Sequence, residues 1–296
     1  MSAIGFRVAK APPEATRRAA LAAAVTLAAS RAAKGHDHTA SMERLQALLV
    51  PARGPEDIVF LVYPGCTALD FVGPHNMLRG LMGATVRLVA KTREPIITDT
   101  GLAVLPDLDF ASCPEAPTLI CVPGGSEGTL AAMEDEATIA FLAGRGRQAA
   151  WITGVCTGTL LLGAAGLLHG YRATSHWLTR DLLPIFGANA VDQRVVFDRN
   201  RVTGGGVTAG IDFGLAMVAA LRDDFYAKAV QLVAEYDPAP PFDAGSPNRA
   251  PPEAREIVET MFAPFLERIR LASETAAGRM PRQIGRQIQA MLGGCS

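Results

Sequence analysis

The stretch that decides the fold is AWITGVCTGTLLLGAAGLL, residues 150–168. Its first part, 150–155, is a short apolar run that predicts a β-strand covered on both faces. A helix is predicted over 157–168, with no loop before it. Glycines stand on both sides of Cys156 and permit a sharp turn between the two elements. We interpret this turn as a nucleophile elbow that lifts Cys156 above the sheet, although the GxSxG pattern of serine hydrolases is absent.

At this elbow Cys156 would face the N-terminus of a helix, where the dipole and the free amides favour the thiolate. A lone free cysteine is more often a small buried hydrophobe, but the glycine flanks and the strand-to-helix switch favour a reactive one here. The four other cysteines have no comparable setting: Cys66, Cys113, Cys121 and Cys295. No cysteine pair has CxxC spacing and no Cys/His cluster is present, so we expect no metal site.

Short strands alternate with helices on both sides of the elbow. Strands are predicted at 58–63, 85–90 and 118–122, short hairpins at 95–106 and 194–203, and helices at 67–82, 130–143, 176–187, 208–221 and 223–235. Such alternation predicts a mostly parallel sheet with helices on both faces. Because open sheets of this kind bind ligands beyond the carboxyl ends of their strands, other segments are expected to converge on Cys156.

The first residue expected to approach Cys156 is Asp70. It lies at the start of the helix that follows the strand at 58–63, and so near the carboxyl end of that strand. A helix-start carboxylate that only stabilises the dipole is the alternative interpretation. An ionised Asp70 beside the sulfur would raise the pKa of the thiol, whereas a protonated one would donate to the thiolate. We therefore expect the two groups to titrate as a coupled pair.

Four further residues are expected at the mouth of the same site. Gly124 and Gly125 follow the strand at 118–122 and could present amides to a developing negative charge, although Pro-Gly-Gly is often only a tight turn. His176 could orient or polarise a ligand, or serve as a hydrogen-bonded structural histidine. Gly205 lies in a glycine run before another helix and is expected to line the same opening.

Both ends of the chain differ in composition from the middle. Residues 1–55 form an N-terminal extension in which 16–34 holds an Arg pair followed by an Ala-rich apolar run. This pattern favours a twin-arginine signal of about 34 residues and periplasmic export, with a cytoplasmic N-terminal helix as the alternative. The α/β domain is expected at 56–237. Residues 238–296 begin with a Pro-rich strap, followed by a helix over 253–277 that is interrupted near Pro264.

Charge and hydropathy exclude several kinds of partner. Among 296 residues, 28 Lys plus Arg nearly cancel 29 Asp plus Glu, and no basic stripe of the kind that nucleic-acid binders carry is visible. No stretch reaches the roughly 18 apolar residues that a membrane span needs. We therefore expect neither a nucleic-acid nor a membrane partner.

Several segments resemble the ThiJ/PfpI superfamily, and most of all its isocyanide hydratase branch. They are VYPGCTALDFVGP, CVPGG, GVCTGTLLLGAAGLLHGYRATSHW, VTGGGVTAGID and EYDPAPPFDAGSP, and they occur in the family's order within residues 57–250. The resemblance implies a flavodoxin-like three-layer α/β sandwich of the class I glutamine-amidotransferase type. It also implies a homodimer with no metal or organic cofactor. On this basis Cys156 is the nucleophile and Asp70 is the carboxylate that contacts the sulfur. Thr157, which follows the nucleophile, is expected to join them as a catalytic residue that shapes the pocket and stabilises charge.

The activity implied by the resemblance is cysteine-dependent hydration of small-molecule isocyanides to N-substituted formamides through a covalent thioimidate. Thr157 stands where peptidase-like members carry a histidine, so proteolysis loses its base. Related regulators add a DNA-binding domain, and no basic helix-turn-helix pattern follows Tyr236. Two alternatives stay open: a non-catalytic or redox-sensing protein, and a glyoxalase or hydrolase that acts on small carbonyls.

Overall fold

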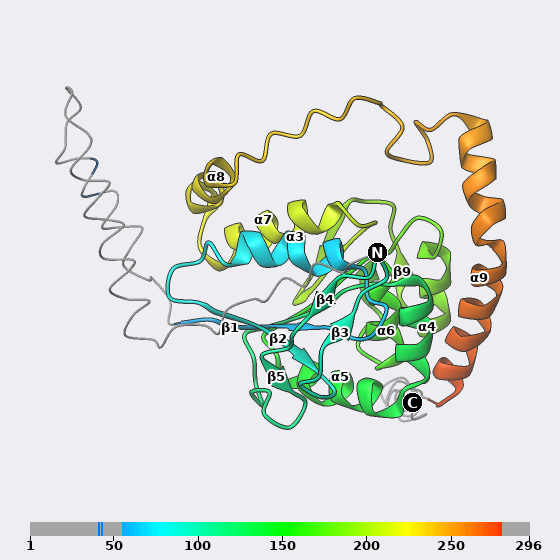
Figure 1. The fold of residues 1–296 in the computed structure, drawn as a ribbon, viewed down its shortest axis with the longest axis horizontal. Helices are drawn as coiled ribbons and strands as arrows, with labels where there is room; N and C mark the ends of the chain where they lie inside the picture. Colours follow the sequence, from blue (N-terminus) through cyan, green and yellow to red (C-terminus); the bar gives the residue numbers. More distant parts are fainter. Residues whose placement is uncertain (1–40, 42, 44–54, 280–296) are drawn as a thin grey trace, which may run out of the picture. The chain divides into compact units, whose positions relative to one another are not determined.

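A seven-stranded sheet forms the centre of the protein in the computed structural model, which describes residues 41, 43 and 55–279 (Figure 1). The strand order is β10-β11-β7-β6-β1-β2-β5. Every neighbouring pair is parallel except β10 with β11, which form a hairpin. The strands are β1 (Asp57–Leu61), β2 (Thr85–Ala90), β5 (Leu108–Asp109), β6 (Leu119–Val122), β7 (Trp151–Val155), β10 (Val195–Asp198) and β11 (Arg201–Gly204).

The three central strands β7, β6 and β1 are buried on both faces because their sequences are nearly continuous apolar runs. Two small sheets lie outside this core. One pairs β3 (Ile96–Ile97) with β4 (Ala103–Val104) in an antiparallel hairpin, and the other pairs β8 (Arg172–Ala173) with β9 (Asn189–Ala190) in parallel. The hairpins predicted at 95–106 and 194–203 are therefore both present.

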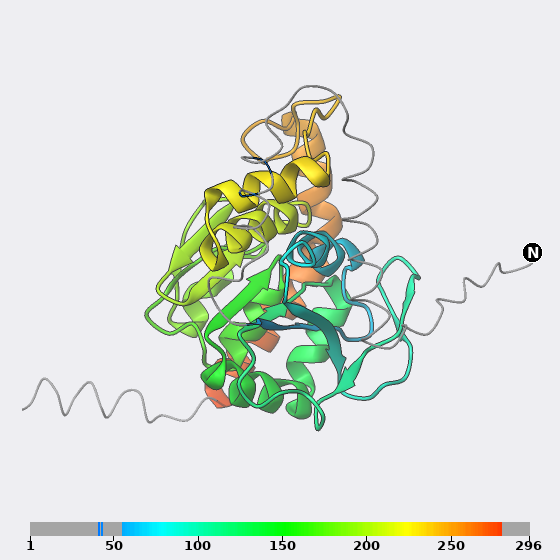
Figure 2. The ribbon, with the colours of Figure 1, turned by 90° about the vertical axis from the view of Figure 1, so that its left-hand side faces the viewer.

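Helices cover both faces of the large sheet, as the alternation of elements predicts (Figures 1 and 2). On one side α3 (Ala68–Leu78) packs against α7 (Ala209–Leu221), which in turn contacts α8 (Asp224–Val233). The other side carries α4 (Ser126–Glu134), α5 (Glu136–Gln148), α6 (Gly158–Ala164), η1 (Arg180–Phe186) and α9 (Pro252–Arg279). The mostly parallel, flavodoxin-like α/β fold is confirmed.

Three predicted helices differ from the observed ones in more than the residues at which they begin and end. The helix expected at 130–143 is two helices, because Asp135 is extended and its side chain caps α5 by accepting from the Thr138 amide. The helix expected at 176–187 is a 3₁₀ helix over Arg180–Phe186 that contains Pro184. The interruption expected near Pro264 is wrong: α9 continues through it, since burial of Phe265 and Ile269 offsets the missing amide.

Some predictions concern residues outside the described ranges. The twin-arginine segment lies there, as does Cys295. The Pro-rich strap is described from 238 to 251 and contains neither helix nor strand. None of the described helices is long and apolar enough to cross a membrane.

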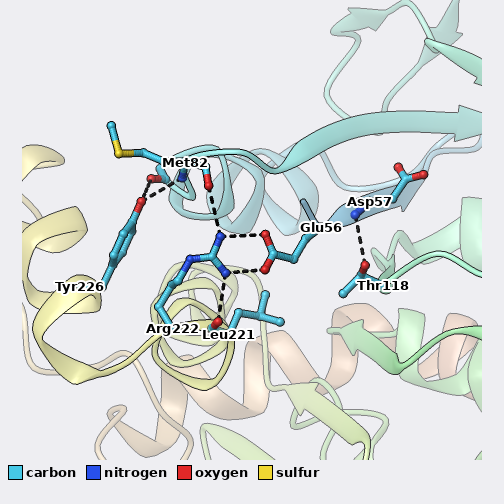
Figure 3. A network of polar contacts seen from close by, with 8 residues as sticks. Glu56, Asp57, Met82, Thr118, Leu221, Arg222 and Tyr226 are labelled. Carbon is cyan, nitrogen blue, oxygen red and sulfur yellow. Dashed lines mark hydrogen bonds and ion pairs between the residues drawn. The ribbon is translucent and has the colours of Figure 1, made fainter. Parts of the chain in front are cut away.

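A buried ion pair joins the end of α7 to the residue before β1, at the end of the sheet where β1 begins (Figure 3). Both terminal guanidinium nitrogens of Arg222 donate to the Glu56 carboxylate, Nη2 at 2.8 Å, and the side chains are only 7% and 5% exposed. Arg222 also donates to the carbonyls of Leu221 (3.0 Å) and Met82 (3.2 Å). Arg222 thus connects β1, α7 and the loop between α3 and β2.

Candidate active site

Cys156 occupies the sharp turn between β7 and α6 in a left-handed backbone conformation, with φ +59°. A non-glycine residue pays roughly 1–2 kcal/mol for this conformation, so surrounding contacts must hold it there. The Cys156 amide donates to the carbonyls of Gly204 (3.1 Å) and Gly205 (2.9 Å), and the Ser175 hydroxyl donates to its carbonyl at 2.9 Å. The strand-to-helix elbow expected from the sequence is present.

Asp70 lies in the first turn of α3 and is fully buried beside the elbow. Its Oδ2 accepts from the Gly124 amide at 2.8 Å, whereas its buried Oδ1 has no hydrogen-bond partner among the described residues. Burial raises the pKa of this carboxyl from 3.8 to about 7, while the hydrogen bond from the Gly124 amide and the nearby Cys156 thiol act in the opposite direction. The acid and the thiol are therefore neighbours, and each affects the other's ionisation.

The thiol of Cys156 has a pKa raised well above its ordinary value, first by burial and then by the charge of Asp70. The backbone amides of Thr157 and Val207 act in the opposite direction, by hydrogen bonding to the sulfur. We expected the helix N-terminus to favour the thiolate; in the structure, burial and the nearby carboxyl outweigh it. Ionising either group is unfavourable, so the site is suited to hold a shared proton.

The turn after β6 lies between the acid and the elbow. The Gly125 amide donates to Thr157 Oγ1 at 3.0 Å, and the Gly124 amide donates to Asp70. A Cβ on Gly124 would lie 2.5 Å from Thr157 Oγ1 and 2.9 Å from Asp70 Oδ2, so only glycine fits between them. These two amides, expected to face a developing charge, instead point inward and hold Asp70 and Thr157.

The glycine run after β11 supports the elbow from the other side. Gly205 donates its amide to the Arg194 carbonyl at 2.9 Å and accepts the Cys156 amide, so its N–H is engaged within the protein. His176 lies against the same loop, since a Cβ on Gly206 would be 2.7 Å from its Cδ2. Burial lowers the pKa of His176, which favours the neutral imidazole near pH 7.

Ser175 and Val207 are two site residues that the sequence analysis missed. Ser175 is the neighbour of His176, and its hydroxyl makes the contact to the elbow. Val207 follows the glycine run and supplies an amide to the sulfur. Both lie close in sequence to residues already singled out, His176 and Gly205. Each of the two contacts has a backbone atom as one of its partners, and residue type does not reveal such contacts.

The other described cysteines have different surroundings. Cys66, Cys113 and Cys121 are buried free thiols, and burial raises the pKa of Cys66 to about 11 and that of Cys121 to about 12. None of them has the left-handed backbone of Cys156. Across residues 55–279, no group of three or more His, Cys, Asp and Glu side chains is placed to hold a metal ion.

Fold and site together define a class of protein: a flavodoxin-like α/β sandwich with a cysteine on a strained strand-to-helix elbow and a buried carboxyl beside it. The sequence model of the DJ-1/PfpI family matches residues 56–220, and the chain belongs to this family.

Known relatives agree with this assignment. The isonitrile hydratase of Pseudomonas putida is 46% identical over 223 residues, which cover 75% of this chain and 97% of the hydratase. The crystal structure of a ThiJ/PfpI family protein from Pseudomonas syringae is 50% identical, with a TM-score of 0.75, and the match covers 84% of this chain and 99% of that one. The transcriptional regulator GbdR of Pseudomonas aeruginosa is 28% identical, over 74% of this chain and 63% of the regulator. Dimer formation stays a prediction.

Proposed function

We propose that this protein is a hydro-lyase that converts isocyanides to N-substituted formamides, with Cys156 as nucleophile and Asp70 as proton carrier. The observation that carries the proposal is the buried Asp70 carboxyl beside a cysteine on a left-handed elbow. The 46% identity to an isonitrile hydratase, over nearly the whole of that protein, supports the same reaction.

In the first step the sulfur of Cys156 forms a bond to the terminal carbon of the isocyanide, R–N≡C. The thiol proton passes to Asp70 and from there to the same carbon, which gives the thioimidate R–N=CH–S. Nothing is oxidised or reduced and no group leaves. Asp70 suits this role because its pKa of about 7 allows it both to accept and to donate a proton near neutral pH.

In the second step water adds to the thioimidate carbon through its oxygen, and one of its protons reaches the nitrogen through Asp70. The adduct R–NH–CH(OH)–S then collapses: the C–S bond breaks, the carbonyl forms, and the hydroxyl proton returns to the sulfur. The products are the formamide R–NH–CHO and the free thiol. Covalent catalysis thereby splits one difficult hydration into two easier steps.

Other residues of the site position Cys156 and Asp70 or stabilise the charges that form on them. The amides of Thr157 and Val207 would stabilise negative charge on the sulfur as it attacks and leaves. Gly124 orients the acid, Gly125 fixes Thr157, and the Gly205 carbonyl holds the elbow. We assign His176 to the wall of the substrate site, as a neutral side chain beside the 204–207 loop.

The direct test is incubation of the purified protein with cyclohexyl isocyanide, with product formation followed by NMR. We expect N-cyclohexylformamide to accumulate and methylglyoxal, offered separately, to remain unchanged. Consumption of methylglyoxal without formamide formation would favour the carbonyl-processing alternative. If neither compound reacts but Cys156 is reversibly oxidised by peroxide, the protein is a redox sensor and the proposal is wrong.

The pH dependence should reflect the coupled pair. Because the pKa of Asp70 is about 7 and that of Cys156 is higher, the pair loses its first proton near pH 7 and keeps the second. The one-proton form attacks, so kcat/KM should fall about tenfold per pH unit below 7 and be level above it.

The variant Asp70→Asn should lose the fall of kcat/KM below pH 7, because its amide does not titrate there. It should also lower kcat by roughly 10²–10⁴-fold, because the amide cannot carry the proton. Near-wild-type turnover by this variant, measured between pH 5 and 9, would contradict the role of Asp70.

A further inference from the structure

A row of buried hydroxyl groups leads away from the elbow toward β1. The Thr157 hydroxyl lies 2.8 Å from that of Thr129 on α4, which lies 3.1 Å from the hydroxyl of Tyr63. Tyr63 follows β1 and donates to the carbonyl of Pro123 at 2.7 Å. All three side chains are buried, and nothing in the reaction proposed above uses Tyr63 or Thr129.

The hydrogen bonds of this row can run in only one direction. Tyr63 has a single hydroxyl proton, and the Pro123 carbonyl can only accept it. Thr129 must therefore donate to Tyr63, and Thr157 must in turn donate to Thr129. Burial raises the pKa of Tyr63 well above its ordinary value, so its hydroxyl keeps the proton on which this direction depends.

The direction determines what Thr157 can do. Its one hydroxyl proton is donated to Thr129 and is therefore not available to the sulfur, and its oxygen accepts the Gly125 amide. Thr157 is thus anchored by its side chain, while its backbone amide serves the sulfur of Cys156. The far end of the row is Pro123, which directly precedes the glycine whose amide holds Asp70.

We infer that Tyr63 and Thr129 are positioning residues that set the placement of the Asp70 carboxyl relative to the Cys156 sulfur. The inference rests on the proposed function, since the pair they position is the proposed catalytic pair. The row fixes both partners: Thr157 on the side of the sulfur, and the Pro123–Gly125 turn on the side of the acid. Proton transfer between sulfur, acid and substrate depends on this placement, and small displacements lower rates steeply.

The experiment compares Tyr63→Phe and Thr129→Val with two matched controls. Tyr226→Phe removes a similar buried hydroxyl, which donates to the Gly80 carbonyl (2.9 Å) and accepts the Met82 amide (2.8 Å) far from the elbow. Thr129→Ser keeps the hydroxyl that Thr129→Val removes. The readouts are kcat and KM for cyclohexyl isocyanide and the rate of Cys156 alkylation by iodoacetamide between pH 5 and 10. Alkylation of the other cysteines is subtracted with Cys156→Ala.

Tyr63→Phe and Thr129→Val are expected to lower kcat about tenfold or more with little change in KM. The alkylation profile should have its midpoint where the pair loses its first proton, near pH 7 in the wild type. In the two variants this midpoint should move to higher pH by about half a unit or more, because the Gly124 amide that lowers the pKa of the acid is less well placed. Thr129→Ser should restore both quantities, and Tyr226→Phe should change neither.

An unshifted alkylation midpoint in Tyr63→Phe would overturn the inference, and so would an equal shift in Tyr226→Phe. If Thr129→Val does not fold, Tyr63→Phe decides the question. Alkylation needs no isocyanide, so it still tests the row if the wild-type protein produces no formamide. In that case the proposed function fails and the positioning of the pair is judged separately.

Discussion

Cys156→Ala is expected to abolish formamide formation from cyclohexyl isocyanide, with a loss of at least about 10³-fold in kcat/KM. The variant removes the sulfur that is proposed to form the thioimidate and leaves the backbone of the elbow in place, because its amide and carbonyl contacts do not involve the sulfur. The measurement is a product assay with enough protein to detect residual turnover. Formamide formation within tenfold of the wild-type rate would show that the sulfur of Cys156 is not the nucleophile.

A trapped adduct provides an independent readout of the same prediction. Addition of an isocyanide to a thiol expels nothing, so the thioimidate should increase the mass of the protein by that of the whole isocyanide. After rapid acid quenching and proteolysis, we expect this increase on the peptide that contains Cys156. Adduct on Cys66 or Cys121 instead would count against the assignment, and Cys156→Ala serves as the blank.

Arg222→Ala is expected to lower the free energy of unfolding by about 3–5 kcal/mol. The substitution leaves the Glu56 carboxylate buried without its cation and leaves the Met82 carbonyl without the guanidinium donor (Figure 3). Because the pair joins the start of β1 to the end of α7, its loss affects the central sheet directly. Urea unfolding at pH 7, monitored by circular dichroism, measures the change.

Two control variants distinguish the cost of leaving a buried charge unpaired from the cost of losing any ion pair. Arg255→Ala breaks an exposed pair with Glu259 within α9 and should change the unfolding free energy by no more than about 0.5 kcal/mol. The double variant Glu56→Leu with Arg222→Met removes both buried charges and should recover much of the lost stability. If Arg222→Ala and Arg255→Ala lower the free energy of unfolding equally, the buried Glu56–Arg222 pair does not stabilise the fold more than an exposed pair does, and the prediction is wrong.

Local sequence patterns were sufficient to predict the strands and the turn that position the site. Apolar runs predicted the central strands β1, β6 and β7, and the glycines around Cys156 predicted the elbow between β7 and α6. The topological rule for parallel sheets then predicted that Asp70 would approach the sulfur. These inferences succeeded because each depends on residues close together in sequence or on a general rule of chain geometry.

Helix ends and interruptions were harder to predict, because distant packing competes with local preference. Pro264 does not interrupt α9, since neighbouring apolar side chains of that helix are buried against the rest of the protein. The single helix expected at 130–143 is divided at Asp135, where the side chain caps the next helix. At Pro264 distant packing outweighed a local helix-breaking signal, whereas at Asp135 the local capping signal itself decided and the predicted helix overlooked it.

By itself, the sequence determined the parallel α/β architecture and the position of Cys156 at the turn from a strand into a helix. Only the tertiary structure decided the electrostatics: burial and Asp70 raise the pKa of the thiol, where a helix N-terminus alone would favour the thiolate. The tertiary structure also turned the amides of Gly124 and Gly125 inward and joined Thr157 to Tyr63 through Thr129. The physical reason is that desolvation and hydrogen-bond direction depend on groups from several strands and helices, which only the folded chain brings together.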